Sequence, residues 1–375
     1  MSWFLAFIGF ALLIMLHEAG HFAAAKAVGM RVERFSLFFP PFIWRKQGKG
    51  ETEYTLGIIP LGGYVKITGM NPDHELPEDV RDRAYHAQPV WKRVVVIAAG
   101  PLVNVIIALV LLFTFYAGIG VLTGAEVAAI DKSYPAASAL KPGDKILAVD
   151  GVKVDMNSAD GRKKITEQVG SHTCGQDRPV KGCRAKEPVS LLIERDGKQR
   201  QANVTPIYDP DAAPIEEGGK KGRMRVGFGY GQTDPRETLS PGEALTESLD
   251  RAWFVTWETI KLPARLVDSE RRKEVSSVVG GYEVTRQTIL ERVPDVVIVL
   301  AIISLSLAII NLFPFLPLDG GHIFWAVVEK IRRKPVPLAV MERASVIGFL
   351  LVIGVFIIGL SNDIDRLTGE GFQVR

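Results

Sequence analysis

Four long apolar runs constrain this chain more than any other feature of its sequence. They cover residues 3–28, 94–121, 296–315 and 338–360, and each contains few charged side chains. A helix needs about 20 predominantly apolar residues to cross the hydrocarbon core of a bilayer. The sequence therefore predicts a multi-pass α-helical membrane protein with four transmembrane helices.

The first run differs from a cleavable signal peptide. No positive charge precedes it, and no clear cleavage site of small residues ends it before the polar residues at 17–21. A signal peptide normally has both features. We expect residues 3–28 to be retained as a membrane span.

Basic residues indicate how the spans are oriented. They are frequent in residues 30–93 and again in residues 319–337. Loops rich in Lys and Arg lie on the cytoplasmic side, whereas long domains cross the membrane largely regardless of charge. We therefore predict that the protein lies in the inner (plasma) membrane and that both segments face the cytoplasm. Residues 123–293 and both termini are then extracytoplasmic.

The polar stretch between the second and third runs is long enough to form a folded domain. We divide the chain into residues 1–121, with two spans and the cytoplasmic loop 30–93, and residues 122–232, the extracytoplasmic domain. Residues 233–293 form a helical linker, and residues 294–375 hold the last two spans with the loop between them.

The cytoplasmic loop shows a β-hairpin pattern. Residues 53–60 and 61–67 are rich in β-formers, and Gly62-Gly63 supplies a bend. Breaks of this kind between two such runs indicate a hairpin. An aromatic cluster between Phe35 and Trp44 suits the membrane interface.

The extracytoplasmic segment mixes strand and helix patterns, so we expect an α+β domain. Residues 124–130 fit a strand, residues 162–169 fit a helix, and Asp196-Gly197 fits a tight hairpin turn. Cys174 and Cys183 are the chain's two cysteines. A disulfide between them and two free thiols are both open, because pairing requires close Cα atoms.

The linker begins with a helix-start pattern. Ser240, Pro241 and Glu243 match a capping box with proline at the first helical position. Apolar residues from Leu245 to Ile260 then recur at helical spacing. This amphipathic helix fits the outer membrane face or packing on the soluble domain equally well.

The first span contains a metal-binding pattern. His17-Glu18-Ala19-Gly20-His21 places two histidines four residues apart, on one face of a helix. Both imidazoles can then reach one zinc ion, and the glutamate can act as the base of a hydrolase. Ionisable groups inside an apolar span are expensive and indicate a functional site. Chance occurrence is therefore a poor explanation here.

Catalytic zinc usually has three protein ligands and one open position. Asp319 is the strongest candidate for the third, because it ends the third run on the same side of the membrane as His17 and His21. Pro314 and Pro317 interrupt the helix before it, and irregular backbone at membrane depth requires a cavity or burial in protein. His322 is a rival ligand, which we place nearby or at the surface. His74, His86 and His172 lie in polar segments and are expected to be solvated.

Two asparagines lie in the spans. Asn104 is a lone amide early in the second span, and Asn311 occurs late in the third. Each fits an oxyanion donor or substrate-positioning group, and each equally fits a hydrogen bond between helices.

Three of these motifs together resemble the site-2 protease family of intramembrane zinc metalloproteases. They are His17 to His21, Gly100-Pro101-Leu102-Val103-Asn104, and Asn311 to Gly320, each on the expected span. Residues 60–65 are similar to that family's membrane-associated β-hairpin. Residues 135–151 are similar to a bacterial PDZ domain, so the resemblance is to the regulator-of-sigma-E type with one such domain.

This resemblance implies a function as well as a fold. It implies that His17, His21 and Asp319 bind Zn²⁺ and that Glu18 is the catalytic base. It implies intramembrane cleavage of a single-pass membrane protein, such as an anti-sigma factor already trimmed outside. The PDZ-like domain would be a size filter or a tail sensor. Residues 170–188 depart from the PDZ pattern, which makes peptide binding by the domain an open question.

Other classes of function fit the sequence less well. A net charge of +3 gives no argument for nucleic acid as a partner. A silent scaffold that binds partners through its PDZ-like domain has no use for the buried base Glu18. A metal transporter would use the same ligands as an ion site, but the chain shows no internal repeat.

Overall fold

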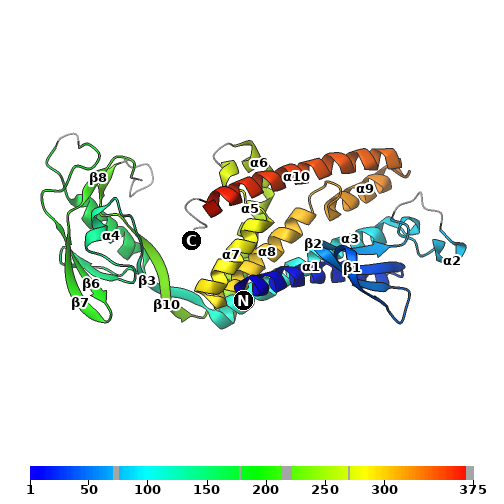
Figure 1. Ribbon diagram of the computed structural model, residues 1–375, viewed down its shortest axis with the longest axis horizontal. Coiled ribbons are helices and arrows are strands. Elements are labelled where there is room, and N and C mark those ends of the chain that lie inside the picture. The colour runs from blue at the N-terminus through cyan, green and yellow to red at the C-terminus, as the bar shows by residue number, and fades with distance from the viewer. Residues whose placement is uncertain (71–75, 177–178, 213–221, 269–270, 369–375) are drawn as a thin grey trace. The chain divides into compact units, whose positions relative to one another are not determined.

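The computed structural model describes residues 1–70, 76–176, 179–212, 222–268 and 271–368. It consists of two compact units (Figure 1). The membrane unit comprises Met1–Gly118 and Leu239–Arg375, and the inserted unit comprises Ile119–Thr238. The insertion of one unit into the sequence of the other separates the first two apolar runs from the last two.

Four helices of the described residues are long and apolar enough to cross a membrane, which confirms the predicted spans. They are α1 (Ser2–Ala27), α3 (Val90–Thr114), α8 (Val296–Asn311) and α10 (Leu338–Thr368). A π-helical turn, η2 (Phe115–Ile119), extends α3, and a 3₁₀ turn, η5 (Val293–Asp295), precedes α8.

The third span ends earlier than residue 315, where its apolar run stops. Helix α8 ends at Asn311. Pro314 and Pro317 follow, and the residue before a proline is disfavoured in helical conformation. The next helix, α9 (Asp319–Arg332), then begins at Asp319.

Helix α3 is the central element of the membrane unit. It packs against α1, α8 and α9 (Figure 1). Val96 and Ile97 of α3 join a buried apolar cluster with Ala25 near the end of α1 and Met30, which follows α1. One helix therefore contacts every segment that carries a predicted metal ligand.

The loop between the first two spans forms an antiparallel pair of strands, β1 (Val32–Gln47) and β2 (Glu53–Ile67). The prediction of a hairpin between residues 53–60 and 61–67 was wrong in detail. Both halves of β2 pair with β1 instead: Ser36 is opposite Thr55 on one side and Tyr64 on the other. Residues Arg34 to Leu37 of β1 therefore have strand partners on both sides.

The remaining helices of the membrane unit are short, apart from α5. Helix α5 begins with the predicted capping box between Ser240 and Glu243. The others connect the spans or flank them. The complete set, α5 included, is α2 (Glu78–Arg81), η1 (Tyr85–Ala87), α5 (Pro241–Ile260), α6 (Leu262–Val267), η4 (Arg271–Glu274) and α7 (Val278–Glu291).

Helix α5 packs against α8 and α3 of the membrane unit. Val255 joins Ala108 and Leu305 in a buried cluster. The opposite face is exposed and apolar, with Leu249 and Trp253 among its residues. An apolar outer face on a helix bound to membrane spans favours contact with lipid.

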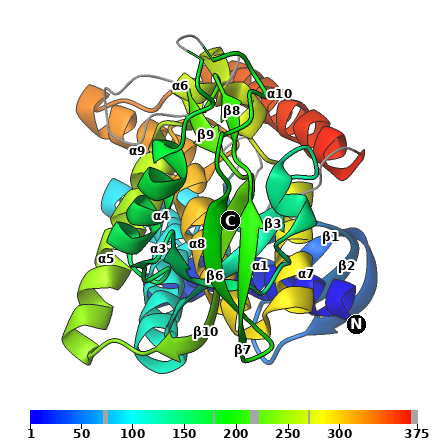
Figure 2. The same cartoon turned by 90° about the vertical axis from the view of Figure 1, so that its left-hand side faces the viewer.

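The inserted unit is an α+β fold, as the sequence predicts (Figure 2). Its four-stranded antiparallel sheet has the order β5-β4-β6-β7, and two further pairs are β3 with β10 and β8 with β9. Its elements are β3 (Val121–Ile130), η3 (Pro135–Ser138), β4 (Lys145–Val149), β5 (Val152–Lys153), α4 (Ala159–Ser171), β6 (Val189–Arg195), β7 (Lys198–Val204), β8 (Ile207–Asp209), β9 (Arg223–Arg225) and β10 (Phe228–Glu237).

The predicted tight turn joins β6 to β7. Arg195 pairs with Lys198, which leaves Asp196 and Gly197 as a two-residue loop. Both loop residues have positive φ, 53° and 70°. Aspartate followed by glycine tolerates this conformation better than most residue pairs.

A buried ion pair lies in the inserted unit. The Asp144 side chain is fully buried and receives hydrogen bonds from Arg195 Nε (2.6 Å) and the second guanidinium nitrogen (2.7 Å). Burial raises the pKa of this carboxyl group, but the Arg195 bonds and the hydrogen bond from the Lys141 main-chain nitrogen together lower it by more, so the net pKa is below its ordinary value. Asp144 therefore stays ionised in the folded unit.

The structure contains a disulfide between Cys174 and Cys183. It closes a loop between α4 and β6, the segment where the sequence departs from the PDZ pattern. Disulfides persist in oxidising compartments and are rare in the cytosol.

Candidate metal centre

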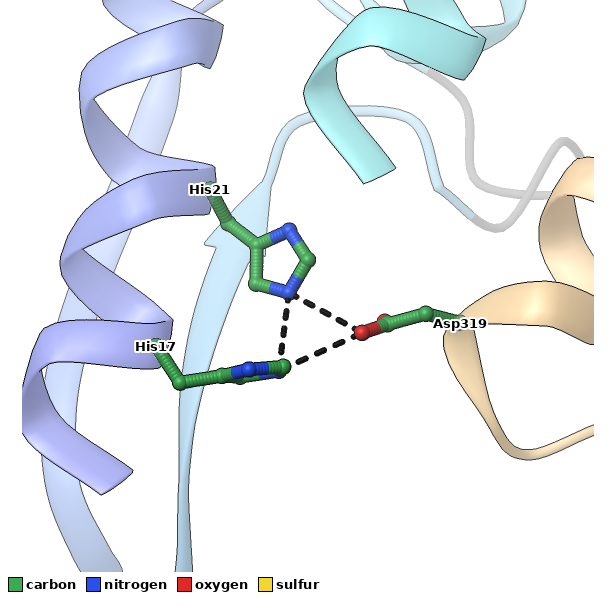
Figure 3. Close-up of side chains that lie close together, drawn as sticks. All are labelled: His17, His21 and Asp319. Carbon is green, nitrogen blue, oxygen red and sulfur yellow. Dashed lines mark hydrogen bonds and ion pairs between the residues drawn. The ribbon is translucent and has the colours of Figure 1, made fainter. Parts of the chain in front are cut away.

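His17 and His21 form one side of a buried site on α1. Each residue is 7% exposed, and their Nε2 atoms lie 3.2 Å apart (Figure 3). Residues four apart in a helix lie one above the other, so both rings point to the same side. The helix itself therefore brings two imidazole nitrogens to one point.

Asp319 completes the group from another element. It is the first residue of α9, after the proline-containing turn, and its Oδ2 lies 3.2 Å from Nε2 of His17 and of His21 (Figure 3). Gly320 and Gly321 follow it, and a Cβ on Gly320 would overlap the carbonyl oxygen of Leu312. These glycines let the helix start close against the turn.

The chemistry of these three atoms fits a metal cation. The ring of His21 is oriented by a hydrogen bond between its Nδ1 and the carbonyl oxygen of Val96 (2.9 Å). Nδ1 must be the donor in that bond, so a neutral ring has its lone pair on Nε2. Asp319 Oδ2 is buried and lacks a hydrogen-bond donor among the described residues. Two imidazole nitrogens and a carboxylate oxygen at this separation are a ligand set for zinc.

Helix α3 holds His21 from a second direction. Gly100 lies one turn after Val96, and a Cβ at Gly100 would overlap Nε2 of His21. A position that close to the ring allows only glycine without movement of the imidazole. The predicted motif at residues 100–104 therefore supports the site sterically.

We expect Gly100→Ala to weaken zinc binding by about tenfold or more, a loss typical of changes to groups that support metal ligands. The new methyl group would displace the His21 ring from the other two ligands. Zinc affinity of the purified protein, measured by chelator competition, checks this. Gly118→Ala is the control, because a methyl group at Gly118 would point into open space. Equal affinity in both variants would contradict the steric role.

Glu18 interacts electrostatically with His17, His21 and Asp319 and does not belong to the cluster of ligand atoms. Its side chain runs along the β-sheet, where its Cγ would lie 2.8 Å from a Cβ on Gly63. The sequence places Glu18 directly after His17 on the same helix. A carboxylate next to a metal site, but outside the ligand set, is suited to proton transfer.

The other predicted groups lie outside the ligand cluster. Asn104 is fully buried, and both atoms of its amide lack a hydrogen-bond partner among the described residues. Asn311 is the last residue of α8. His322 is three residues after Asp319 in α9 and does not belong to the cluster of ligand atoms. The oxyanion role of either asparagine stays a prediction.

The remaining histidines have other surroundings. His86 Nδ1 bonds the carbonyl oxygen of Gly69 (3.0 Å). His172 was expected to be solvated, but its Nε2 bonds the Asp150 carboxylate (2.9 Å) in the inserted unit. His74 lies outside the described residues.

Sequence reasoning missed two supports of the site. The Val96 carbonyl is a main-chain group, so no residue type marks it. Gly63 was visible as part of a glycine pair, but that pair was interpreted only as a bend. The close approach of Gly63 to Glu18 depends on how the β1–β2 sheet packs on α1.

Comparison with known proteins gives a consistent result. The sequence profile of peptidase family M50 matches residues 5–355. The Escherichia coli protein named regulator of sigma-E protease is 27% identical over 445 aligned positions, covering 96% of this chain and 97% of that protein.

Two further relatives are of similar length. A protein of Brucella suis named "Putative zinc metalloprotease" is 28% identical, and the alignment covers 94% of this chain and 92% of that protein. A protein of Nostoc with the same descriptive name is 29% identical, with 96% and 95% covered. The similarity therefore extends over both units and not only over the metal centre.

Proposed function

The chain belongs to peptidase family M50 and is a multi-pass membrane zinc metallopeptidase, and we propose that it makes an intramembrane cut in single-pass membrane proteins. One observation carries the proposal. His17, His21 and Asp319 converge in the membrane unit from two different elements, with Glu18 beside them. A metal centre enclosed by protein at membrane depth can bring a water molecule and a base to a peptide carbonyl away from lipid.

The residues of the site have distinct tasks in this proposal. His17, His21 and Asp319 would hold zinc, which supplies Lewis-acid chemistry and makes water a better nucleophile at neutral pH. Glu18 accepts the proton from the attacking water and delivers it to the leaving nitrogen. The hydrogen bond to Val96 keeps His21 in the tautomer that presents Nε2 to the ligand group.

The substrate class follows from the location of the site. Its residues lie in and beside membrane spans, so a scissile bond must come from a membrane-spanning segment. We propose that the inserted unit excludes proteins with a bulky outer domain or senses a newly trimmed tail. An anti-sigma-factor-like protein already cut outside would satisfy both conditions.

Two tagged single-span proteins test this activity. One retains its outer domain and the other lacks it, and each is co-expressed with the chain or with Glu18→Gln. The proposal expects a membrane-internal fragment only from the trimmed protein and only with the unsubstituted chain. Cleavage of both proteins would remove the filter, and cleavage that does not depend on Glu18 would remove the proposed mechanism.

We also propose that the inserted unit lies outside the cytoplasm, with the metal centre near the cytoplasmic side. The basic loops and the disulfide in the inserted unit support this orientation. Its two cysteines are bonded to each other and leave no free thiol in the chain.

Single introduced cysteines should report the orientation. Lys198 on the inserted unit and Lys49 between β1 and β2 are both exposed. A membrane-impermeant thiol reagent should label Lys198→Cys in cells with an opened outer envelope. Lys49→Cys should react only after the membrane is permeabilised. The reverse pattern would invert the proposed orientation.

A further inference from the structure

The membrane unit contains an ion pair outside the ligand group, in which one partner is buried and the other is partly exposed. Arg93 in the first turn of α3 is 8% exposed, and its two terminal nitrogens donate to Glu329 of α9 at 2.9 and 2.7 Å. The Glu329 side chain is 30% exposed. Neither residue belongs to the cluster of ligand atoms, so the proposed chemistry leaves the pair unexplained.

Stability alone does not account for this pair. Removing a charge from water costs several kcal/mol per buried ion, a cost that falls mainly on the buried Arg93, and apolar replacements of buried pairs are often neutral or stabilising. A bidentate contact between guanidinium and carboxylate, by contrast, fixes distance and direction together. The pair is therefore better suited to setting geometry than to holding the unit together.

The geometry it sets is that of the helix carrying Asp319. Helix α9 runs without interruption from Asp319 to Arg332. Glu329 is ten residues after Asp319, which is about 15 Å along a helix. Helix α9 packs against α3. A fixed contact at Glu329 therefore restricts the tilt and rotation of α9, whose first residue is the proposed ligand Asp319.

The same face of α3 orients His21, one of the other two ligands. Val96, whose carbonyl binds the His21 ring, is three residues after Arg93. Residues three apart are neighbours on a helix surface. One turn of α3 thus contacts a ligand of α1 through a main-chain oxygen and the ligand-bearing α9 through a guanidinium group.

We propose that the Arg93–Glu329 pair is a positioning device, which holds Asp319 at binding distance from His17 and His21 by fixing α9 to the helix that orients His21. The inference rests on the metal site of the proposed function. It predicts that the pair affects metal binding although it lies outside the ligand set.

The test compares Arg93→Lys, Glu329→Gln and the exchanged pair Arg93→Glu/Glu329→Arg in the purified full-length chain. Zinc affinity is measured by chelator competition, and the visible spectrum of the cobalt(II)-loaded protein reports ligand geometry. Both single variants should bind zinc about tenfold more weakly, with weaker cobalt bands, as found for groups that orient metal ligands. The exchanged pair should recover part of the affinity.

Asp144→Asn is the matched control, because it breaks another bidentate pair, that with Arg195 in the inserted unit. It should lower the melting temperature and leave zinc affinity unchanged. Zinc affinity within about twofold of the unsubstituted chain in both single variants would overturn the inference, since changes in orienting groups typically cost at least tenfold.

Arg93→Lys decides the matter if Glu329→Gln does not fold, because lysine keeps the charge and loses only the bidentate geometry. Loss of folded protein in that variant, with no recovery in the exchanged pair, would assign the pair to stability and overturn the inference. Failure of the proposed function is distinguishable from both. In that case the unsubstituted chain binds no zinc, or Asp319→Ala binds it equally well.

Discussion

Replacing Glu18 with glutamine is expected to abolish cleavage while zinc stays bound. Glutamine has nearly the same size as glutamate, and Glu18 lies outside the group of ligand atoms. The amide cannot accept the proton of the attacking water. General acid–base groups contribute about 10²- to 10⁴-fold to rate, so cleavage should fall by at least that factor.

Two measurements on the same preparation make the result specific. Fragment formation from the trimmed single-span protein is followed over time, and zinc per chain is determined by mass spectrometry. Glu247→Gln is the control, because Glu247 is an exposed carboxylate on α5, away from the ligand group. Loss of zinc together with activity would show that Glu18 supports the metal site and is not only a base. Full activity would exclude it as the base.

The spans and the candidate ligands His17, His21 and Asp319 could be predicted from the sequence because their signals are largely local. An apolar run of the length of a bilayer is a signal in itself: α1 matches its run to within one residue at each end, and α10 begins with its run at Leu338 and continues to Thr368. The spacing of His17 and His21 is a property of one helix. Asp319 could be predicted as a ligand because two prolines mark the end of α8 and because the spans alternate in direction.

The supports of the site could not be predicted because they depend on contacts between distant segments. Val96 acts through a carbonyl oxygen, which every residue has. Arg93 and Glu329 are 236 residues apart and look like ordinary basic and acidic residues of membrane flanks. The predicted hairpin between residues 53–60 and 61–67 was wrong for a related reason, because both segments pair with β1. A strand with partners on both sides has no local signature beyond its aromatic residues.

Replacing Asp319 with alanine is expected to remove zinc from the protein. Asp319 Oδ2 is one of three ligand atoms and the only one with a formal charge, lying 3.2 Å from each histidine nitrogen. Groups that merely orient ligands contribute about 10- to 100-fold to affinity, so loss of a direct ligand should cost more than about 100-fold. Zinc content after dialysis should fall close to zero, and cleavage should be lost with it.

The comparison with other variants separates the ligand role from a folding role. His322→Ala removes the rival ligand on the same helix and should keep zinc, because His322 does not belong to the ligand cluster. Asp365→Ala removes an exposed carboxylate of α10 and should also keep it. If Asp319→Ala keeps zinc and His322→Ala loses it, the third ligand is His322. If Asp319→Ala loses zinc and Glu18→Gln keeps it, binding and proton transfer belong to different carboxylates, as the positions of Asp319 on α9 and Glu18 on α1 require.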